Sequence, residues 1–230
     1  MSWSTRLEKL GFTVKEMVRC RTNSGGAVFI PARVNDKPVQ MMFSNHRGYD
    51  CHLYQSYVTD HALSVDLITL SAFGRTATNP HVHVWGEYRE GSPPMAGFLC
   101  APFFQDGIVA IDASVPAMAW ATARDRLSLS GAVSRLALHG ARVTLDGKHF
   151  AVGYQVASSV AEQDLGNRKP GRHGRVDLSV SLPGVGTISE SVVARQAKAG
   201  FAGVLGHDFW CRWITVFDLA ASELLLFPYD

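Results

Sequence analysis

The sequence predicts an all-β protein with minor α content, built as two pseudo-symmetric β-barrel lobes with an inter-lobe cleft. Two observations support this prediction. Short alternating segments separated by Gly, Pro, Asn and Asp dominate the chain, which is typical of β-rich domains. A stretch in the first half also recurs in the second, as expected for a duplicated unit.

Eight segments of apolar or alternating character are predicted as strands, and helical periodicity is scarce. The predicted strands are Ala27–Val34, Val39–Phe43, His81–Trp85, Ile108–Ile111, Arg142–Leu145, Phe150–Val156, Arg175–Leu182 and Ile214–Asp218. Short helices are predicted at Leu53–Ala62 and Ser191–Ala199.

Two turn sequences each join a predicted strand to a following apolar strand. The first is Asn35-Asp36-Lys37-Pro38 and the second is Asp146-Gly147-Lys148. Asp-Gly is a favourable pair for a type I′ hairpin turn, so the second turn predicts a tight hairpin.

The repeat defines the expected domain organisation. Gly97–Asp112 aligns with Gly203–Asp218 without a gap, and Gly, Leu, Phe, Ile and Asp recur in step. A weaker match aligns Lys37–Phe43 with Lys148–Tyr154. We therefore expect an N-terminal extension at 1–26, a first lobe at 27–122 and a second at 123–230. The alternative is one unrepeated β-sandwich with two similar strands.

Composition excludes several classes of function. The chain has 230 residues, 47% of them hydrophobic, which is enough for a sizeable core without a metal or disulfide. A net charge of +2 argues against nucleic-acid and anionic-membrane partners. The 4 cysteines are scattered singly, and no run of apolar residues has the length of a signal peptide or membrane span. We expect a cytoplasmic protein with no cofactor.

No metal site is predicted either. His81 and His83 have a spacing that can chelate a metal, but no third ligand of matching pattern lies nearby in the sequence. A solvent-facing strand edge is the preferred interpretation of this pair.

Two parts of the chain resemble the retropepsin-like and pepsin-like aspartic proteases. Val34–Phe43, followed by the Ser44–His52 loop, resembles the strand that leads into that family's Asp-Thr/Ser-Gly loop. Gly203–Phe209 resembles its hydrophobic-hydrophobic-Gly segment. The resemblance implies two lobes of aspartic-protease type around a cleft.

The sequence departs from that family at both catalytic positions. Ser44-Asn45-His46 stands in place of the first Asp-Thr-Gly, and the second position is expected near Gln155-Val156-Ala157. Aspartic proteolysis needs two carboxylates that share one proton. The sequence therefore predicts no pepsin-type proteolysis. If the register of the second lobe shifts, Asp146 or Asp164 would compete for the position, but neither is followed by Thr/Ser-Gly.

The candidate site follows from the resemblance. His46 is a candidate proton donor or acceptor, with Asp50 to orient it and Ser44 beside it. Other residues are expected to bind substrate through hydrogen bonds, charge or an apolar wall: Asn45, Gln155, Tyr154, Phe43, His207 and Arg172, the last from a basic hairpin tip.

Three function classes remain open. The preferred one is a non-proteolytic protein whose cleft binds and converts a small molecule, as a cyclase or isomerase would. The first alternative is a non-catalytic pseudoprotease that binds a peptide or metabolite, and the second is a structural or assembly protein. We expect a monomer or homodimer with a small-molecule or peptide ligand.

Overall fold

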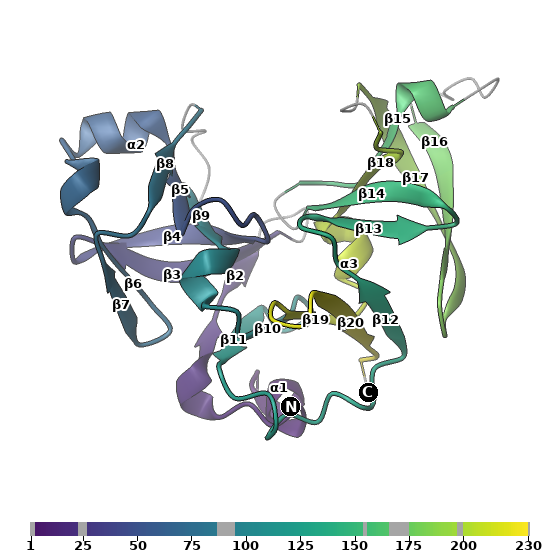
Figure 1. Ribbon diagram of the computed structural model, residues 1–230, viewed down its shortest axis with the longest axis horizontal. Coiled ribbons are helices and arrows are strands. Elements are labelled where there is room, and N and C mark those ends of the chain that lie inside the picture. The colour runs from purple at the N-terminus through teal and green to yellow at the C-terminus, as the bar shows by residue number, and fades with distance from the viewer. Residues whose placement is uncertain are drawn as a thin grey trace.

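A computed structural model of the chain describes residues 3–22, 27–86, 95–153, 156–165, 175–196 and 200–229. Within these residues the strands form three sheets. Two sheets make separate lobes, and the third lies beneath both and joins them (Figure 1). The predicted all-β class with minor α content is confirmed, since the helices are few and short.

The first lobe contains a sheet in the order β7-β6-β3-β4-β9-β5-β8, with β2 paired to β3. Its strands are β2 (Arg21–Thr22), β3 (Val28–Val34), β4 (Lys37–Ser44), β5 (Cys51–Leu53), β6 (Thr69–Ala72), β7 (Arg75–Thr78), β8 (Val82–Val84) and β9 (Met95–Cys100). The second lobe has the order β13-β14-β18-β15-β17-β16. Its strands are β13 (Arg142–Leu145), β14 (Lys148–Gly153), β15 (Ser159–Ala161), β16 (Arg175–Leu182), β17 (Gly186–Arg195) and β18 (Gly203–Gly206).

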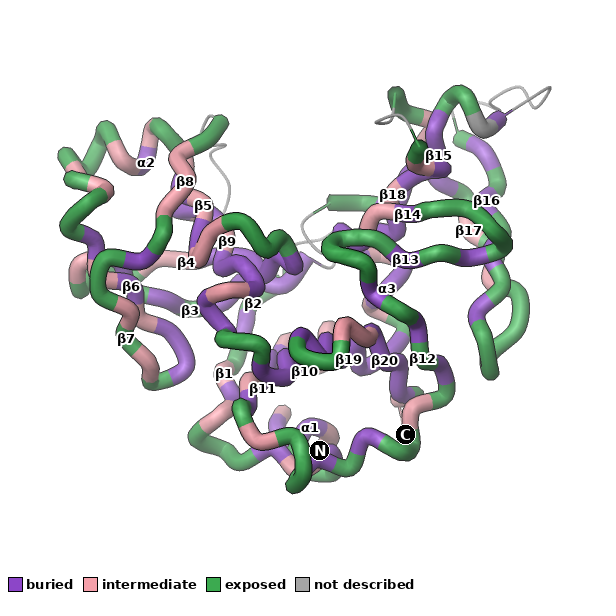
Figure 2. The backbone as a smooth tube through the Cα atoms, in the orientation of Figure 1, coloured by how far each residue is buried: buried purple, intermediate pink, exposed green. Residues whose placement is uncertain are grey.

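The central sheet has the order β1-β11-β10-β19-β20-β12. Its strands are β1 (Met17–Arg19), β10 (Ile108–Asp112), β11 (Ala117–Ala121), β12 (Ser134–Ala137), β19 (Ile214–Asp218) and β20 (Glu223–Phe227). Strands from both predicted lobes and from the predicted N-terminal extension thus share one sheet. Every residue of β10 and β19 is buried, so these two strands form the middle of the core that joins the lobes (Figure 2).

The predicted duplication is visible in how β10 and β19 pair. They run antiparallel, with Ile108 opposite Asp218, Ala110 opposite Val216 and Asp112 opposite Ile214. Equivalent positions of the repeat therefore lie symmetrically about the Ala110–Val216 pair, as a two-fold axis through this pair would place them.

The same duplication appears inside each lobe. In the first, β4 runs parallel to β9 while β5 runs antiparallel to β9. In the second, β14 runs parallel to β18 while β15 runs antiparallel to β18. Gly97 begins the pairing of β9 with β5, and Gly203 begins the pairing of β18 with β14. A Cβ on Gly97 would lie 1.8 Å from the carbonyl oxygen of His52, and one on Gly203 would lie 2.1 Å from that of Ser159. Both glycines are required by close backbone approach.

The helices are short. They are α1 (Thr5–Lys9), η1 (Val14–Glu16), α2 (Gln55–Asp60), η2 (Val65–Leu67), η3 (Ala101–Phe104), η4 (Glu162–Asp164) and α3 (His207–Trp210). The N-terminal segment is part of the core rather than an appendage, because Leu7 of α1 is fully buried among side chains of the central sheet.

Most predicted elements are confirmed, and two are corrected. Both predicted turns are type I′ hairpins with positive φ at Asn35, Asp36, Asp146 and Gly147. The helix predicted from Leu53 begins only at Gln55, because Leu53 belongs to β5. The helix predicted at Ser191–Ala199 is wrong for residues 191–195, which continue β17.

The reason for the second correction is cross-strand pairing. Ser191-Val192-Val193 pairs with β16 residues 175–177, and β-branched side chains suit such a sheet. The remainder of that predicted helix falls mostly on residues 197–199, which lie outside the described residues.

Candidate functional site

The loops after β4 and β14 are the structural equivalents in the two lobes. Both strands run toward the middle of the molecule, between the lobes (Figure 1). Ser44 ends β4 opposite Cys100 of β9, and Gly153 ends β14 opposite Gly206 of β18. Since Cys100 and Gly206 are equivalent in the repeat, Gly153 is the partner position of Ser44.

This register corrects the position expected for the second loop, which was near Gln155. The turns that precede β4 and β14 do align, but β4 has 8 residues and β14 has 6. An irregularity between Gln40 and Met41 shifts the pairing of β4 with β9. Counting from the turns therefore places the equivalent position two residues too late in the second lobe.

Ser44 and Asn45 are both buried at the base of the first loop. Ser44 is 7% exposed, and its Oγ accepts a hydrogen bond from the backbone nitrogen of His46 at 3.3 Å. Asn45 is 4% exposed, and its Nδ2 has no hydrogen-bond partner among the described residues. A buried amide donor without an acceptor costs free energy, so Asn45 has an unmet hydrogen bond to offer a ligand.

His46 is exposed, and a backbone hydrogen bond from Gly48 holds its ring in place. Its carbonyl oxygen accepts from the Ala101 nitrogen at 3.0 Å, which fixes the loop to the start of η3. The backbone nitrogen of Gly48 donates to Nδ1 of His46 at 3.1 Å. A neutral imidazole that accepts at Nδ1 carries its proton on Nε2. His46 is thus set to donate a hydrogen bond through Nε2.

Asp50 does not orient His46 as predicted. Its Oδ2 accepts from the backbone nitrogen of His81 at 2.7 Å, and its own nitrogen donates to the carbonyl of His81 at 2.9 Å. No hydrogen bond joins Asp50 to His46 in the part of the chain that the structure describes. Asp50 instead attaches the end of the loop to the segment before β8, which is a structural role.

A cluster of aromatic side chains covers the outer side of this loop. Tyr49 stacks on His83 with ring centres 4.6 Å apart, and it also contacts His46, His52 and His81. Nδ1 of His52 lies 3.0 Å from Nδ1 of His83, so one ring donates to the other. Burial is the main cause that lowers the pKa of His52 to about 4, and the nearby imidazoles of His46 and His83 add to it, because they disfavour a second positive charge. His52 is therefore neutral near neutral pH.

Sequence reasoning missed Tyr49 and His52. The cluster depends on the parallel pairing of β5 with β8, which sets His52 directly opposite His83. The edge-strand position expected for the His81–His83 segment is confirmed, but His83 is half-buried against its neighbours.

Two other predicted binding residues belong to the interior. Phe43 is 3% exposed and packs between Phe104 at 5.6 Å and Phe217 at 4.8 Å, so it joins the first lobe to the central sheet. His207 is 7% exposed at the start of α3, where its backbone nitrogen donates to Val156 at 2.9 Å. Neither presents an exposed surface to a ligand.

The remaining predicted site residues, Tyr154, Gln155 and Arg172, lie outside the described residues. Within the described ranges, no group of three or more His, Cys, Asp or Glu side chains is arranged to hold a metal ion. None of the helices in these ranges combines the length and apolarity that crossing a membrane requires.

Comparisons with known proteins identify the fold. The sequence matches no protein-family model, and no curated protein matches it significantly. Among solved structures, the chain is similar to the aspartic proteinase from Irpex lacteus, with a TM-score of 0.57 and 9% sequence identity. The match covers 93% of this chain and 97% of that chain. The protein therefore has the two-lobed fold of an aspartic proteinase.

Proposed function

We propose that this chain is a non-proteolytic protein of aspartic-proteinase fold that binds a small molecule between its lobes, at the loop formed by residues 44–50. The observation that carries the proposal is the pair of equivalent positions at the ends of β4 and β14. Ser44 occupies one and Gly153 the other. Neither residue has a carboxylate.

The proposed loss of proteolysis follows from proton chemistry. In an aspartic proteinase one carboxylate removes a proton from water while its protonated partner polarises the peptide carbonyl. A serine hydroxyl and a glycine cannot share that proton. Ser44 also lacks the features of a nucleophile, because Nδ1 of His46 is occupied by Gly48 and cannot act as its base.

The groups that remain are hydrogen-bond donors, and they suit a substrate with a carbonyl or carboxylate oxygen. The Nε2 proton of His46 and the Nδ2 group of Asn45 belong to neighbouring residues of one loop. Donors aimed at a carbonyl oxygen stabilise the negative charge that develops there during addition or enolisation.

A cyclase or isomerase activity is the catalytic form of this proposal. In a cyclisation, a nucleophilic atom of the substrate would form a bond to its own carbonyl carbon. The carbonyl π electrons would move to the oxygen, which would take the proton from Nε2 of His46. The attacking atom would lose its proton to solvent, and His46 would regain one from solvent. Holding both ends of one flexible molecule supplies much of the required rate enhancement.

Two measurements test the proposal. Incubation of the purified protein with denatured casein from acidic to neutral pH should give no cleavage that pepstatin inhibits. Ligand-detected NMR with a library of small hydroxy- and amino-keto acids should give binding that His46→Ala weakens. His149→Ala is the matched control, since His149 is an exposed imidazole on β14 that hydrogen-bonds to Thr144.

Pepstatin-sensitive cleavage would contradict the loss of proteolysis. Equal binding by the wild type and His46→Ala would contradict the assigned site. Binding of extended peptides, but of no keto acid, would favour a non-catalytic peptide-binding protein. Binding of neither class would favour an assembly role.

A further inference from the structure

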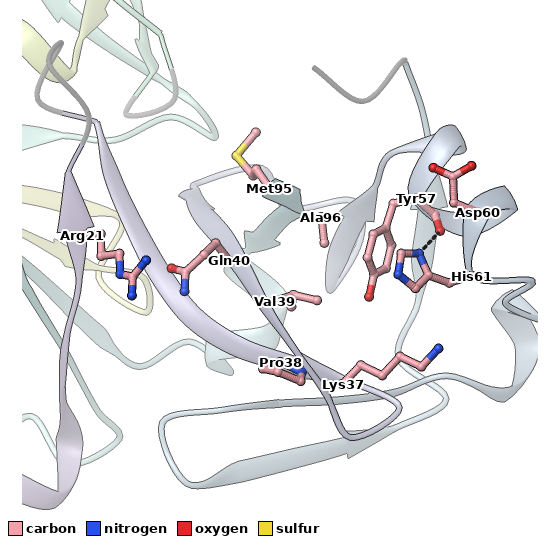
Figure 3. A pocket seen from close by; sticks show the side chains of 10 residues that line it. All are labelled: Arg21, Lys37, Pro38, Val39, Gln40, Tyr57, Asp60, His61, Met95 and Ala96. Carbon is pink, nitrogen blue, oxygen red and sulfur yellow. Dashed lines mark hydrogen bonds between the residues drawn. The ribbon is translucent and has the colours of Figure 1, made fainter. Parts of the chain in front are cut away.

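A cavity of about 490 Å³ lies wholly within the first lobe. It is half open to solvent and is bordered by the beginning of β4, helix α2 and the first residues of β9, with Arg21 of β2 on one side (Figure 3). Its volume is in the range of small-molecule binding sites. Gln40 is the lining residue of β4 nearest to Ser44, and about 13 Å of extended strand separates the two. The cavity is therefore distinct from the loop discussed above.

The wall of the cavity is apolar in its deeper part. Val39, Met95 and Ala96 line it, and Ala96 is only 2% exposed. The ring of Tyr57, held by α2, forms the opposite side and packs against His61 with ring centres 4.3 Å apart. An apolar or aromatic body of a ligand would fit between these surfaces.

Two polar atoms in the cavity lack partners. The hydroxyl of Tyr57 and Oε1 of Gln40 are both buried, and neither has a hydrogen-bond partner among the described residues. Tyr57 is 8% exposed as a residue, so its hydroxyl is among the buried polar groups that are normally satisfied. Figure 3 shows this hydroxyl directed toward the space beside Val39. A ligand that hydrogen-bonds to Tyr57 and Gln40 would remove this cost.

The described residues at the rim carry mainly positive charge. Arg21 and Lys37 line the cavity from two sides, and neither forms an ion pair with a described residue. Asp60 is the one acidic residue among the described residues of the lining, and its carboxylate points away from the Lys37 amine (Figure 3). An anionic group of a ligand would be attracted to this rim.

We propose that this cavity is a binding site for a small amphipathic anion, with its apolar body against Val39 and Met95 and its charged group at one end of the rim, at Lys37 or at Arg21. Its polar groups bond to the Tyr57 hydroxyl or to Oε1 of Gln40, which lie on opposite sides of Val39 (Figure 3). Neither His46 nor Ser44 lines this cavity, so the proposal does not depend on the function proposed above.

The test uses two probes of nearly the same shape. Anilinonaphthalenesulfonate carries an aryl body and a sulfonate, and N-phenylnaphthylamine has the same body without the charge. Fluorescence titration of the full chain should show about 10-fold tighter binding of the anion than of the neutral probe. The double variant Arg21→Gln/Lys37→Gln should lose most of this preference while binding the neutral probe as the wild type does.

Two further variants complete the design. Tyr57→Phe removes one oxygen without changing the shape of the wall and should weaken the anionic probe about 3- to 5-fold. Lys15→Gln is the matched charge control, because Lys15 is exposed on η1 away from the cavity, and it should change nothing. Equal affinity of the wild type for both probes, or equal effects of Lys15→Gln and the double variant, would overturn the proposal.

Discussion

Asp112 and Asp218 lie at equivalent ends of the two strands that form the middle of the central sheet, and both are fully buried. Each carboxylate pairs with an arginine from outside the repeat. Arg6 lies 3.3 Å from Asp112, and Arg124 lies 2.9 Å from Asp218. Each aspartate also accepts a backbone hydrogen bond from the turn that follows its strand, at Ser114 and Ala221.

This pairing predicts matched losses of stability. Asp112→Ala and Asp218→Ala each remove a turn hydrogen bond and the contact of a buried carboxylate with an arginine. We expect each to lower the free energy of unfolding by about 2–4 kcal/mol, measured by urea denaturation. Asp125→Ala is the control, since Asp125 is exposed, and it should change stability by less than about 0.5 kcal/mol. A large effect at only one of the two buried aspartates would contradict their equivalence.

Gly97 of β9 and Gly203 of β18 give a second prediction. Gly97→Ala and Gly203→Ala would push a methyl group into a backbone carbonyl, and backbone cannot move aside cheaply. Each variant should lose about 3 kcal/mol or more, or fail to fold. Gly131→Ala should be tolerated, because the nearest atom to its Cβ would lie 4.0 Å away on Phe227. The unfolding temperatures of the three variants test this prediction. A Gly97→Ala protein as stable as the wild type would show that the backbone at residue 97 does not lie so close to the His52 carbonyl oxygen.

His52 predicts a dependence of stability on pH. Its pKa is lowered from 6.5 to about 4, chiefly by burial, so below pH 6.5 the unfolded chain binds a proton that the folded chain does not. This contribution to stability is complete above pH 6.5 and is lost as the pH falls toward 4. His52→Asn should therefore reduce the slope of unfolding free energy against pH in this window, while the exposed-site control His149→Asn should not. An NMR titration that gives His52 an ordinary pKa would refute the explanation.

The cysteines give a prediction about reactivity. Cys20, Cys51 and Cys100 are buried, and burial raises the pKa of Cys20 and of Cys100 to about 12. Cys211 is only partly buried, although burial raises its pKa as well. Because the thiolate is the reactive form, Cys211 should react first with iodoacetamide, and more slowly than a free thiol. Peptide mass spectrometry locates the label, and Cys211→Ser should leave the folded protein almost unlabelled.

Local signals predicted much of the fold. The Asp146-Gly147 turn and the alternation of Arg175–Leu182 determine structure over a few residues, and both predictions are confirmed. The aligned blocks Gly97–Asp112 and Gly203–Asp218 are also equivalent in space.

The site was harder to predict because it depends on non-local register. A strand that is two residues longer in one lobe moved the second loop position from Gln155 to Gly153. The contact of His52 with His83 requires a parallel pairing across 31 residues, which alternation within one strand does not reveal. Burial of Phe43 against Phe217 likewise depends on how the lobe meets the central sheet.

The pairing of β10 with β19 also means that the central sheet cannot be completed until most of the chain has been synthesised. When the ribosome has released the first half of the chain, β10 can pair with β11 but has no strand on its other side. That open edge stays unpaired until the nascent chain reaches Asp218, so the first half passes through a stage at which strand pairing with another molecule competes with correct folding. Because the strand Ile108–Asp112 is wholly apolar except at its last residue, it is a segment that a chaperone for short hydrophobic strands would bind at this stage.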